Sequence, residues 1–64
     1  MLEKAKTVIK NKRLEMKLSQ KALAKKAGVS FNTIYNVEKG VSNSNLLTYQ
    51  KICEALNIKF SDLL

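Results

Sequence analysis

Histidine, proline and tryptophan are absent from the 64 residues of this chain, and cysteine occurs once, at Cys53. A zinc site built from cysteine and histidine needs several ligands at fixed spacing, so the sequence excludes that kind of metal centre. Without histidine, Cys53 also lacks the usual partner that activates a nucleophile, and the acidic residues are not clustered as in an acid–base site. We therefore predict no enzymatic activity, no metal and no cofactor, and we expect Cys53 to serve in packing.

Long apolar runs and signal segments are missing as well. No stretch approaches the length of about 18 apolar residues that marks a membrane-spanning helix, and the first residues lack the apolar centre of a signal peptide. A single cysteine cannot form an intramolecular disulfide, which fits a reducing compartment. We therefore expect a cytoplasmic protein that spans no membrane.

The chain is short and basic. Its length predicts a single domain over residues 1–64. A domain of this size buries only about 60% of the surface of the unfolded chain, which favours a binding surface over an enclosed pocket. Twelve lysines and arginines against five acidic residues give a net charge of +7, which favours a polyanionic partner, either nucleic acid or an anionic membrane.

Apolar residues recur three and four apart along most of the chain, with no alternation typical of strands. This spacing predicts an all-α fold of five short helices, at residues 2–17, 20–27, 31–39 and 46–56 and around residues 60–64. Ser19, Ser30 and Asn45 stand where an N-cap is needed, and Gly28 and Gly40 stand where helices end. The expected apolar stripe of the fourth helix is Leu46, Tyr49, Ile52, Cys53 and Leu56.

The joint between residues 20–27 and 31–39 is the tightest in the chain. Two helices joined by so few residues, with a glycine in the joint, meet at a steep angle. Ile34 and Val37 then face inward, which leaves an outward face of Phe31, Asn32, Thr33, Asn36 and Lys39. Asparagine can donate to and accept from adenine, and threonine or phenylalanine can contact the thymine methyl group. Tyr35 flanks this face and either braces the core or contacts the DNA backbone.

The stretch LSQKALAKKAGVSFNTIYNVEKG, from Leu18 to Gly40, resembles the lambda-repressor-like helix-turn-helix family of Cro/C1 (XRE) type. The segments NLLTYQKICEALNI and FSDLL extend the resemblance over nearly the whole chain. The family pattern is matched at Leu18, Ser19, Gln20, Leu23, Ala24, Gly28, Val29, Ser30, Ile34, Glu38 and Gly40. The resemblance implies five helices, with the third in the major groove and the second across the DNA backbone.

The resemblance also implies roles for individual residues. It places Phe31, Asn32, Thr33 and Asn36 at base-reading positions. It implies that Gln20 and Ser30 contact phosphate or orient partners, that Asn43 and Asn45 contact phosphate, and that Arg13 forms an ion pair with Glu38. Lys39 is the basic residue of the reading helix itself, and we expect it to contact phosphate too.

Two departures from the family pattern affect these expectations. The family often has proline where Ser44 stands, so the loop before the fourth helix is expected to be looser. The front of the reading helix carries no arginine or lysine, the residues that contact guanine in many members. We therefore expect recognition to favour A·T pairs and thymine methyl groups.

These features predict a sequence-specific, double-stranded-DNA-binding transcriptional regulator, a repressor of bacterial, phage or mobile-element type, associated with the nucleoid. We expect it to bind as a homodimer on a palindromic or pseudo-palindromic site; Phe60, Leu63 and Leu64 would belong either to the core or to a dimer patch. An antitoxin or a restriction–modification controller with the same fold is the alternative. A basic helical protein that binds a membrane or a partner protein is an alternative of another class, disfavoured because residues 2–17 lack tryptophan and phenylalanine.

Overall fold

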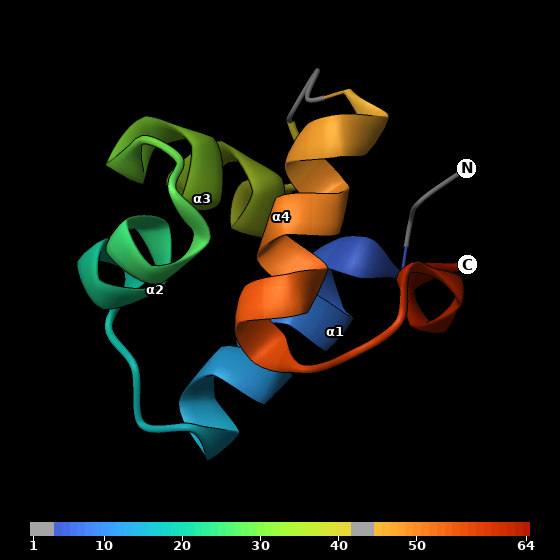
Figure 1. Ribbon diagram of the computed structural model, residues 1–64, viewed down its shortest axis with the longest axis horizontal. Helices are drawn as coiled ribbons and strands as arrows, with labels where there is room; N and C mark the ends of the chain where they lie inside the picture. The colour runs from blue at the N-terminus through green and yellow to red at the C-terminus, as the bar shows by residue number, and fades with distance from the viewer. Residues whose placement is uncertain (1–3, 42–44) are drawn as a thin grey trace.

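A computed structural model of the chain describes residues 4–41 and 45–64. Within these ranges the chain forms four α-helices, α1 (Ala5–Glu15), α2 (Gln20–Ala27), α3 (Phe31–Lys39) and α4 (Leu46–Leu56), followed by a 3-10 turn, η1 (Phe60–Leu63). The predicted all-α class is confirmed, and the fifth predicted helix is the 3-10 turn. Figure 1 shows α2 and α3 together at the left, α4 in the middle and η1 at the right, with α1 running behind and below α4.

The helices begin at the three N-caps that the sequence predicts. The Ser19 hydroxyl accepts a hydrogen bond from the Ala22 amide at 3.0 Å, and the Ser30 hydroxyl accepts one from the Thr33 amide at 3.2 Å. The side-chain oxygen of Asn45 accepts from the Thr48 amide at 2.9 Å. Each bond satisfies an amide that has no partner inside its own helix, so each start is fixed by local chemistry.

The helix ends are only partly as predicted. Gly28 and Gly40 end α2 and α3 with φ angles of 74° and 79°, in the left-handed region that glycine adopts without strain. Two non-glycine residues have the same kind of backbone, Lys17 with φ of 57° and Asn57 with φ of 58°. Because the chain turns at Lys17, α1 ends at Glu15 instead of continuing to residue 17; the predicted start at residue 2 lies outside the described residues.

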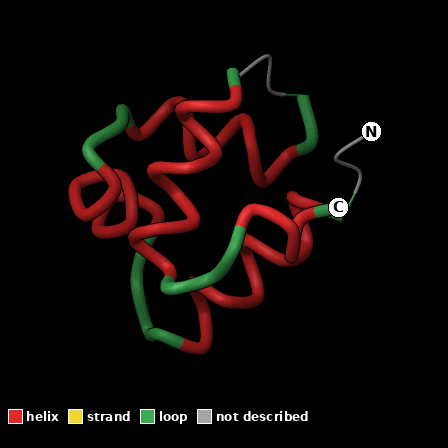
Figure 2. The backbone as a smooth tube through the Cα atoms, turned by 45° about the vertical axis from the view of Figure 1, so that its right-hand side comes forward, coloured by secondary structure: helices red, strands yellow, loops and turns green. Residues whose placement is uncertain are grey.

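The core draws on every element. Its largest fully buried side chains are Ile9, Leu23, Ile34, Ile52, Leu56 and Leu63. They come from α1, α2, α3, α4 and η1 respectively, with two from α4, so each element is anchored by at least one of them. Figure 2 shows the short connections that fold these elements back on one another.

Two expectations about leucines are settled by burial. The prediction that Leu46 belongs to the buried stripe of α4 is wrong. The side chains of Leu46 and Leu47 are exposed, because the first turn of α4 lies at the edge of the molecule. The rest of the predicted stripe of α4 is buried. At the C-terminal end, Leu63 is fully buried and Phe60 packs partly against the core, whereas Leu64 is exposed.

The Cys53 thiol lies on the buried side of α4 with 3% of its surface exposed. Burial, and secondarily the negative charge of Asp62, raise its pKa above the ordinary value. Because the thiolate is the nucleophile, both effects suppress its reaction with thiol reagents.

We expect the folded protein at pH 8 to react with a disulfide reagent at least about a hundredfold more slowly than the chain in guanidinium, since reaction requires unfolding. The time course of absorbance measures both rates, and the single cysteine makes the signal unambiguous. Equal rates in the two states would show that Cys53 is accessible.

Candidate nucleic-acid interface

The helix-turn-helix unit consists of α2, a three-residue joint at residues 28–30, and α3. The joint is closed by a hydrogen bond from the Val29 amide to the Ala24 carbonyl at 3.0 Å. Ala24 is nearly fully buried and Val29 packs partly against the core. The small Ala24 side chain permits a close approach of the two helices, so α2 supports α3 over a short distance.

The two sides of α3 differ sharply in chemistry. Ile34 and Val37 are buried, with exposures of 0% and 2%, and fix the inner side. Asn32 and Asn36 are exposed, one turn apart on the outer side. Thr33 is half-buried, and its hydroxyl oxygen lies 2.9 Å from that of Ser30. The outer side therefore offers two carboxamides free of intramolecular partners among the described residues, while the Thr33 hydroxyl already has one.

An exposed row of side chains runs beside these asparagines. The rings of Phe31 and Tyr35 have centroids 6.0 Å apart and planes tilted by 31°. The Lys39 ammonium lies 5.2 Å from the centroid of the Tyr35 ring and donates to its hydroxyl at 3.4 Å. Tyr35 is therefore a surface residue of α3 and not a core brace.

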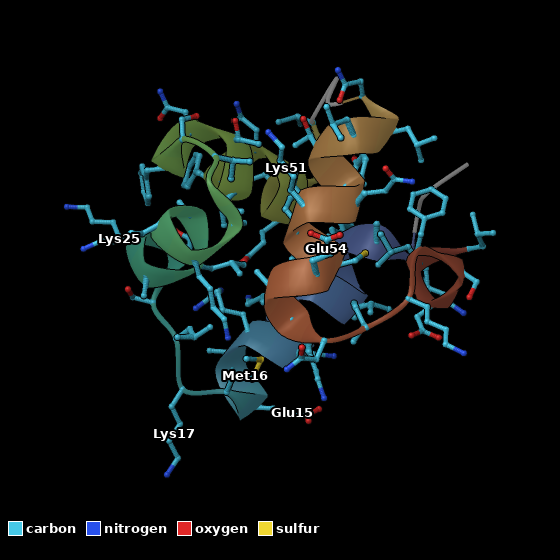
Figure 3. All side chains as sticks on the ribbon, in the orientation of Figure 1. Glu15, Met16, Lys17, Lys25, Lys51 and Glu54 are labelled. Atoms are coloured by element: carbon cyan, nitrogen blue, oxygen red, sulfur yellow. The ribbon has the colours of Figure 1, made fainter. Side chains whose placement is uncertain are left out.

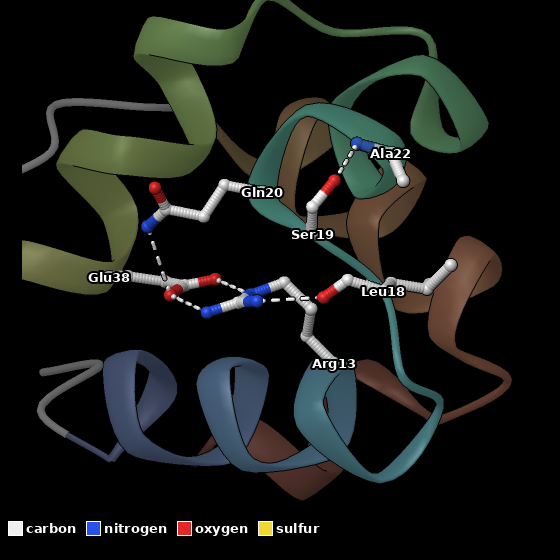
Figure 4. A network of polar contacts seen from close by, with 6 residues as sticks. All are labelled: Arg13, Leu18, Ser19, Gln20, Ala22 and Glu38. Atoms are coloured by element: carbon white, nitrogen blue, oxygen red, sulfur yellow. Dashed lines mark hydrogen bonds and ion pairs between the residues drawn. The ribbon is translucent and has the colours of Figure 1, made fainter.

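A buried ionic network connects α3 to α1, as Figure 4 shows. Arg13 Nε donates to Glu38 Oε2 at 2.7 Å, and Arg13 Nη2 donates to Glu38 Oε1 at 3.0 Å. The two side chains are only 9% and 4% exposed. Arg13 Nη1 also donates to the Leu18 carbonyl at 2.8 Å. The structure thus brings together Arg13 and Glu38, for which the family resemblance implied an ion pair, with bidentate geometry.

Gln20 belongs to the same network. Its side-chain nitrogen donates to Glu38 Oε1 at 3.2 Å, so the network joins α1, α2 and α3 through one carboxylate. The family resemblance implied that Gln20 contacts phosphate or orients partners, and the hydrogen bond to Glu38 corresponds to the second role. This partner was not foreseen, because nothing in the spacing of residues 20 and 38 indicates contact.

The other residues expected to contact phosphate lie at the starts of helices and at the end of α3. Ser30 and Asn45 cap α3 and α4, whose first backbone amides and positive dipole ends suit an anion. Lys39 lies at the end of the aromatic row, and Asn43 lies outside the described residues. Figure 3 shows Lys25 projecting away from α2 and Lys17 from the turn after α1.

Among residues 4–41 and 45–64 there is no group of three or more cysteine, histidine or acidic side chains placed to hold a metal ion. In those ranges no helix combines the length and the apolar character required to cross a membrane.

Comparisons with known proteins show which family the sequence resembles. A family model described as "Helix-turn-helix" matches residues 9–63 of the chain. A curated protein of Archaeoglobus fulgidus, described as an "Uncharacterized HTH-type transcriptional regulator", is 39% identical over 57 residues. That match covers 89% of this chain and 80% of the archaeal protein.

Proposed function

The chain belongs to the helix-turn-helix family of DNA-binding transcriptional regulators, and we propose that it acts as a sequence-specific repressor that reads the major groove with α3. The observation that carries the proposal is the construction of α3. Its outer side presents Asn32 and Asn36, while its inner side is fixed by buried apolar residues and by the Arg13–Glu38 pair. A firmly held helix with exposed carboxamides suits direct reading of base edges.

Base reading is assigned to Phe31, Asn32, Thr33 and Asn36. The two asparagines suit adenine, and Phe31 and the Thr33 methyl suit thymine, so A·T pairs are favoured. Phosphate contact is assigned to Lys39, to Asn43 and to the helix starts capped by Ser30 and Asn45. Gln20 acts at the same surface by holding Glu38 and through it the carboxyl-terminal end of α3.

The assembly we propose is a homodimer on a palindromic or pseudo-palindromic site, with the two copies of α3 in major grooves about one helical turn apart. Occupation of promoter DNA would then exclude polymerase, as expected for a repressor of bacterial, phage or mobile-element type. The protein would act at the nucleoid, in the cytoplasm.

Selection of binding sites from random duplex DNA tests this proposal. We expect one enriched motif with two-fold symmetry and A·T pairs at the α3 contacts. The affinity for that motif should fall log-linearly with salt, with a slope of about −5 if roughly six phosphates are neutralised. Anionic vesicles at the same salt serve as the control and should not bind. A chain that enriches no motif, or a motif with guanine throughout the α3 contacts, would contradict the proposed reading.

A further inference from the structure

The reading helix carries two aromatic rings next to its two asparagines. Phe31 and Tyr35 stand one turn apart with side chains 39% and 42% exposed. Their centroids are 6.0 Å apart, so the rings form a single apolar surface along the helix. Each ring precedes one asparagine in the sequence, which places the row one residue around the helix from Asn32 and Asn36.

Packing within the protein does not account for this surface. The anchoring of α3 is supplied by Ile34 and Val37, which are buried, while Phe31 and Tyr35 each leave a substantial part of their surface exposed. An aromatic pair one turn apart adds only slightly to the stability of a helix. Single exposed apolar residues are ordinary, but here two lie in contact on the side proposed to enter the DNA groove.

We propose that Phe31 and Tyr35 together contact the C5 methyl groups of two neighbouring thymines, which makes Tyr35 a further specificity-determining residue. The inference rests on the proposed major-groove reading. The thymine methyl is the apolar group that base edges present in the major groove. With base pairs about 3.4 Å apart along the axis, rings with centroids 6.0 Å apart span between one and two base-pair steps, so each ring can contact a different one of two neighbouring thymines.

Lys39 follows Phe31 and Tyr35 in the exposed row of α3, and its position fits a surface that contacts both bases and phosphate. Its ammonium lies over the Tyr35 ring, 5.2 Å from the centroid, and bonds to the phenol oxygen at 3.4 Å. The contact places a positive charge at one end of the apolar surface, where the phosphate backbone borders the groove. The row thus has an apolar part for methyl groups and a charged end for phosphate.

Substitution of uracil for thymine tests the proposal directly, because uracil lacks only the C5 methyl and keeps the groove acceptor and the base pairing. Each thymine of the selected motif is replaced in turn, and the dissociation constant is measured at fixed salt. We expect two neighbouring positions at which the wild type binds about four-fold more weakly, the effect of one buried methyl group. Replacement of both should weaken binding about fifteen-fold.

Variants assign each methyl group to a ring. Tyr35→Ala should remove the uracil effect at one position and Phe31→Ala should remove it at the neighbouring one. Leu64→Ala is the matched control, because Leu64 is also exposed but lies beyond η1, on the side of the molecule away from α3. This variant should keep both effects. Thermal melting of each variant verifies the fold, which exposed positions should tolerate.

The outcomes separate the two proposals. If a motif is selected but uracil has no effect at any position, or Tyr35→Ala keeps both effects, the methyl contact is overturned while the proposed DNA reading stands. If no motif is selected from random DNA, both are overturned. Loss of one methyl effect in each variant supports the assignment.

Discussion

Replacement of Glu38 by alanine is expected to lower the free energy of unfolding by about 3–5 kcal/mol, the usual consequence of removing one partner of a buried ion pair. The arginine that remains is the cause. Arg13 is only 9% exposed at its side chain and makes two of its hydrogen bonds to Glu38. Without the carboxylate, its charge is left largely desolvated, with the Leu18 carbonyl as the remaining acceptor.

The size of this effect is large for so small a protein. A stability of about 0.05–0.15 kcal/mol per residue gives roughly 3–10 kcal/mol for 64 residues. Glu38→Ala therefore removes a large share of the total, and the variant should be partly or fully unfolded at 37 °C. Because Glu38 also accepts from Gln20, the loss affects the seating of α3 on α2 as well.

Urea and thermal unfolding of Glu38→Ala, Arg13→Ala and the double variant measure the coupling. We expect the double variant to lose less stability than the sum of the two single variants, since no unpaired charge remains in it. Glu15→Ala is the matched control: Glu15 pairs with Lys12 at 3.6 Å on the surface, where it is 68% exposed, and its removal should change stability by about 0.5 kcal/mol or less. Strictly additive losses at residues 13 and 38 would contradict the coupling.

The parts of the fold that sequence predicts well are those set by a few neighbouring residues. Ser19, Ser30 and Asn45 each cap a helix through the amide three residues ahead, so the bond depends on local sequence alone. Gly28 and Gly40 end helices for an equally local reason, because glycine enters the left-handed region without strain.

The misses involve positions where that local signal is absent. Lys17 adopts the same left-handed backbone without a glycine to mark it, and the first helix therefore ends earlier than predicted. The exposed position of Leu46 depends on where the first turn of α4 lies in the assembled protein, and helical spacing alone cannot show it. Spacing predicts which residues share a face, but not how far the neighbouring helices extend over that face.

In the candidate site, too, some features follow from local sequence and others depend on the tertiary structure. The inward position of Ile34 and Val37 follows from the period of the helix, and so does the outward position of the asparagines. The contact of Gln20 with Glu38 joins residues 18 apart in sequence, and only the tertiary structure shows it. The sequence left open whether Tyr35 braces the core or contacts DNA, and its surface position is shown only by the packing of α3 in the tertiary structure.

The second large effect is expected for the double substitution Asn32→Ala/Asn36→Ala, which should remove most of the sequence preference while it leaves non-specific DNA binding. Each bidentate contact between asparagine and adenine contributes about 1–3 kcal/mol of discrimination. Loss of two such contacts should reduce the affinity for the selected motif roughly a hundredfold or more. The fold should be unchanged, because both side chains are exposed.

The binding that remains should follow charge. Neither substitution alters the net charge of +7, so the variant should keep a steep dependence on salt, with affinity close to that of the wild type for unrelated DNA. Asn11→Ala is the matched control, an exposed asparagine on α1 whose loss should leave the selected motif unchanged. Binding isotherms on the motif and on a scrambled duplex, at three or more salt concentrations, give both quantities.

A lysine substitution is expected to affect DNA binding in a different way from the asparagine double variant, and the comparison separates base contacts from phosphate contacts. Lys25→Ala on α2 should weaken binding to the motif and to the scrambled duplex by similar factors, and should reduce the salt slope by about one if Lys25 contacts a phosphate. The asparagine variant should change the ratio of the two affinities, and Lys25→Ala should change their common level. An asparagine variant that weakens binding to both duplexes equally would mean that α3 contacts the DNA backbone and not the bases. The residues that read the bases would then lie on another surface of the protein.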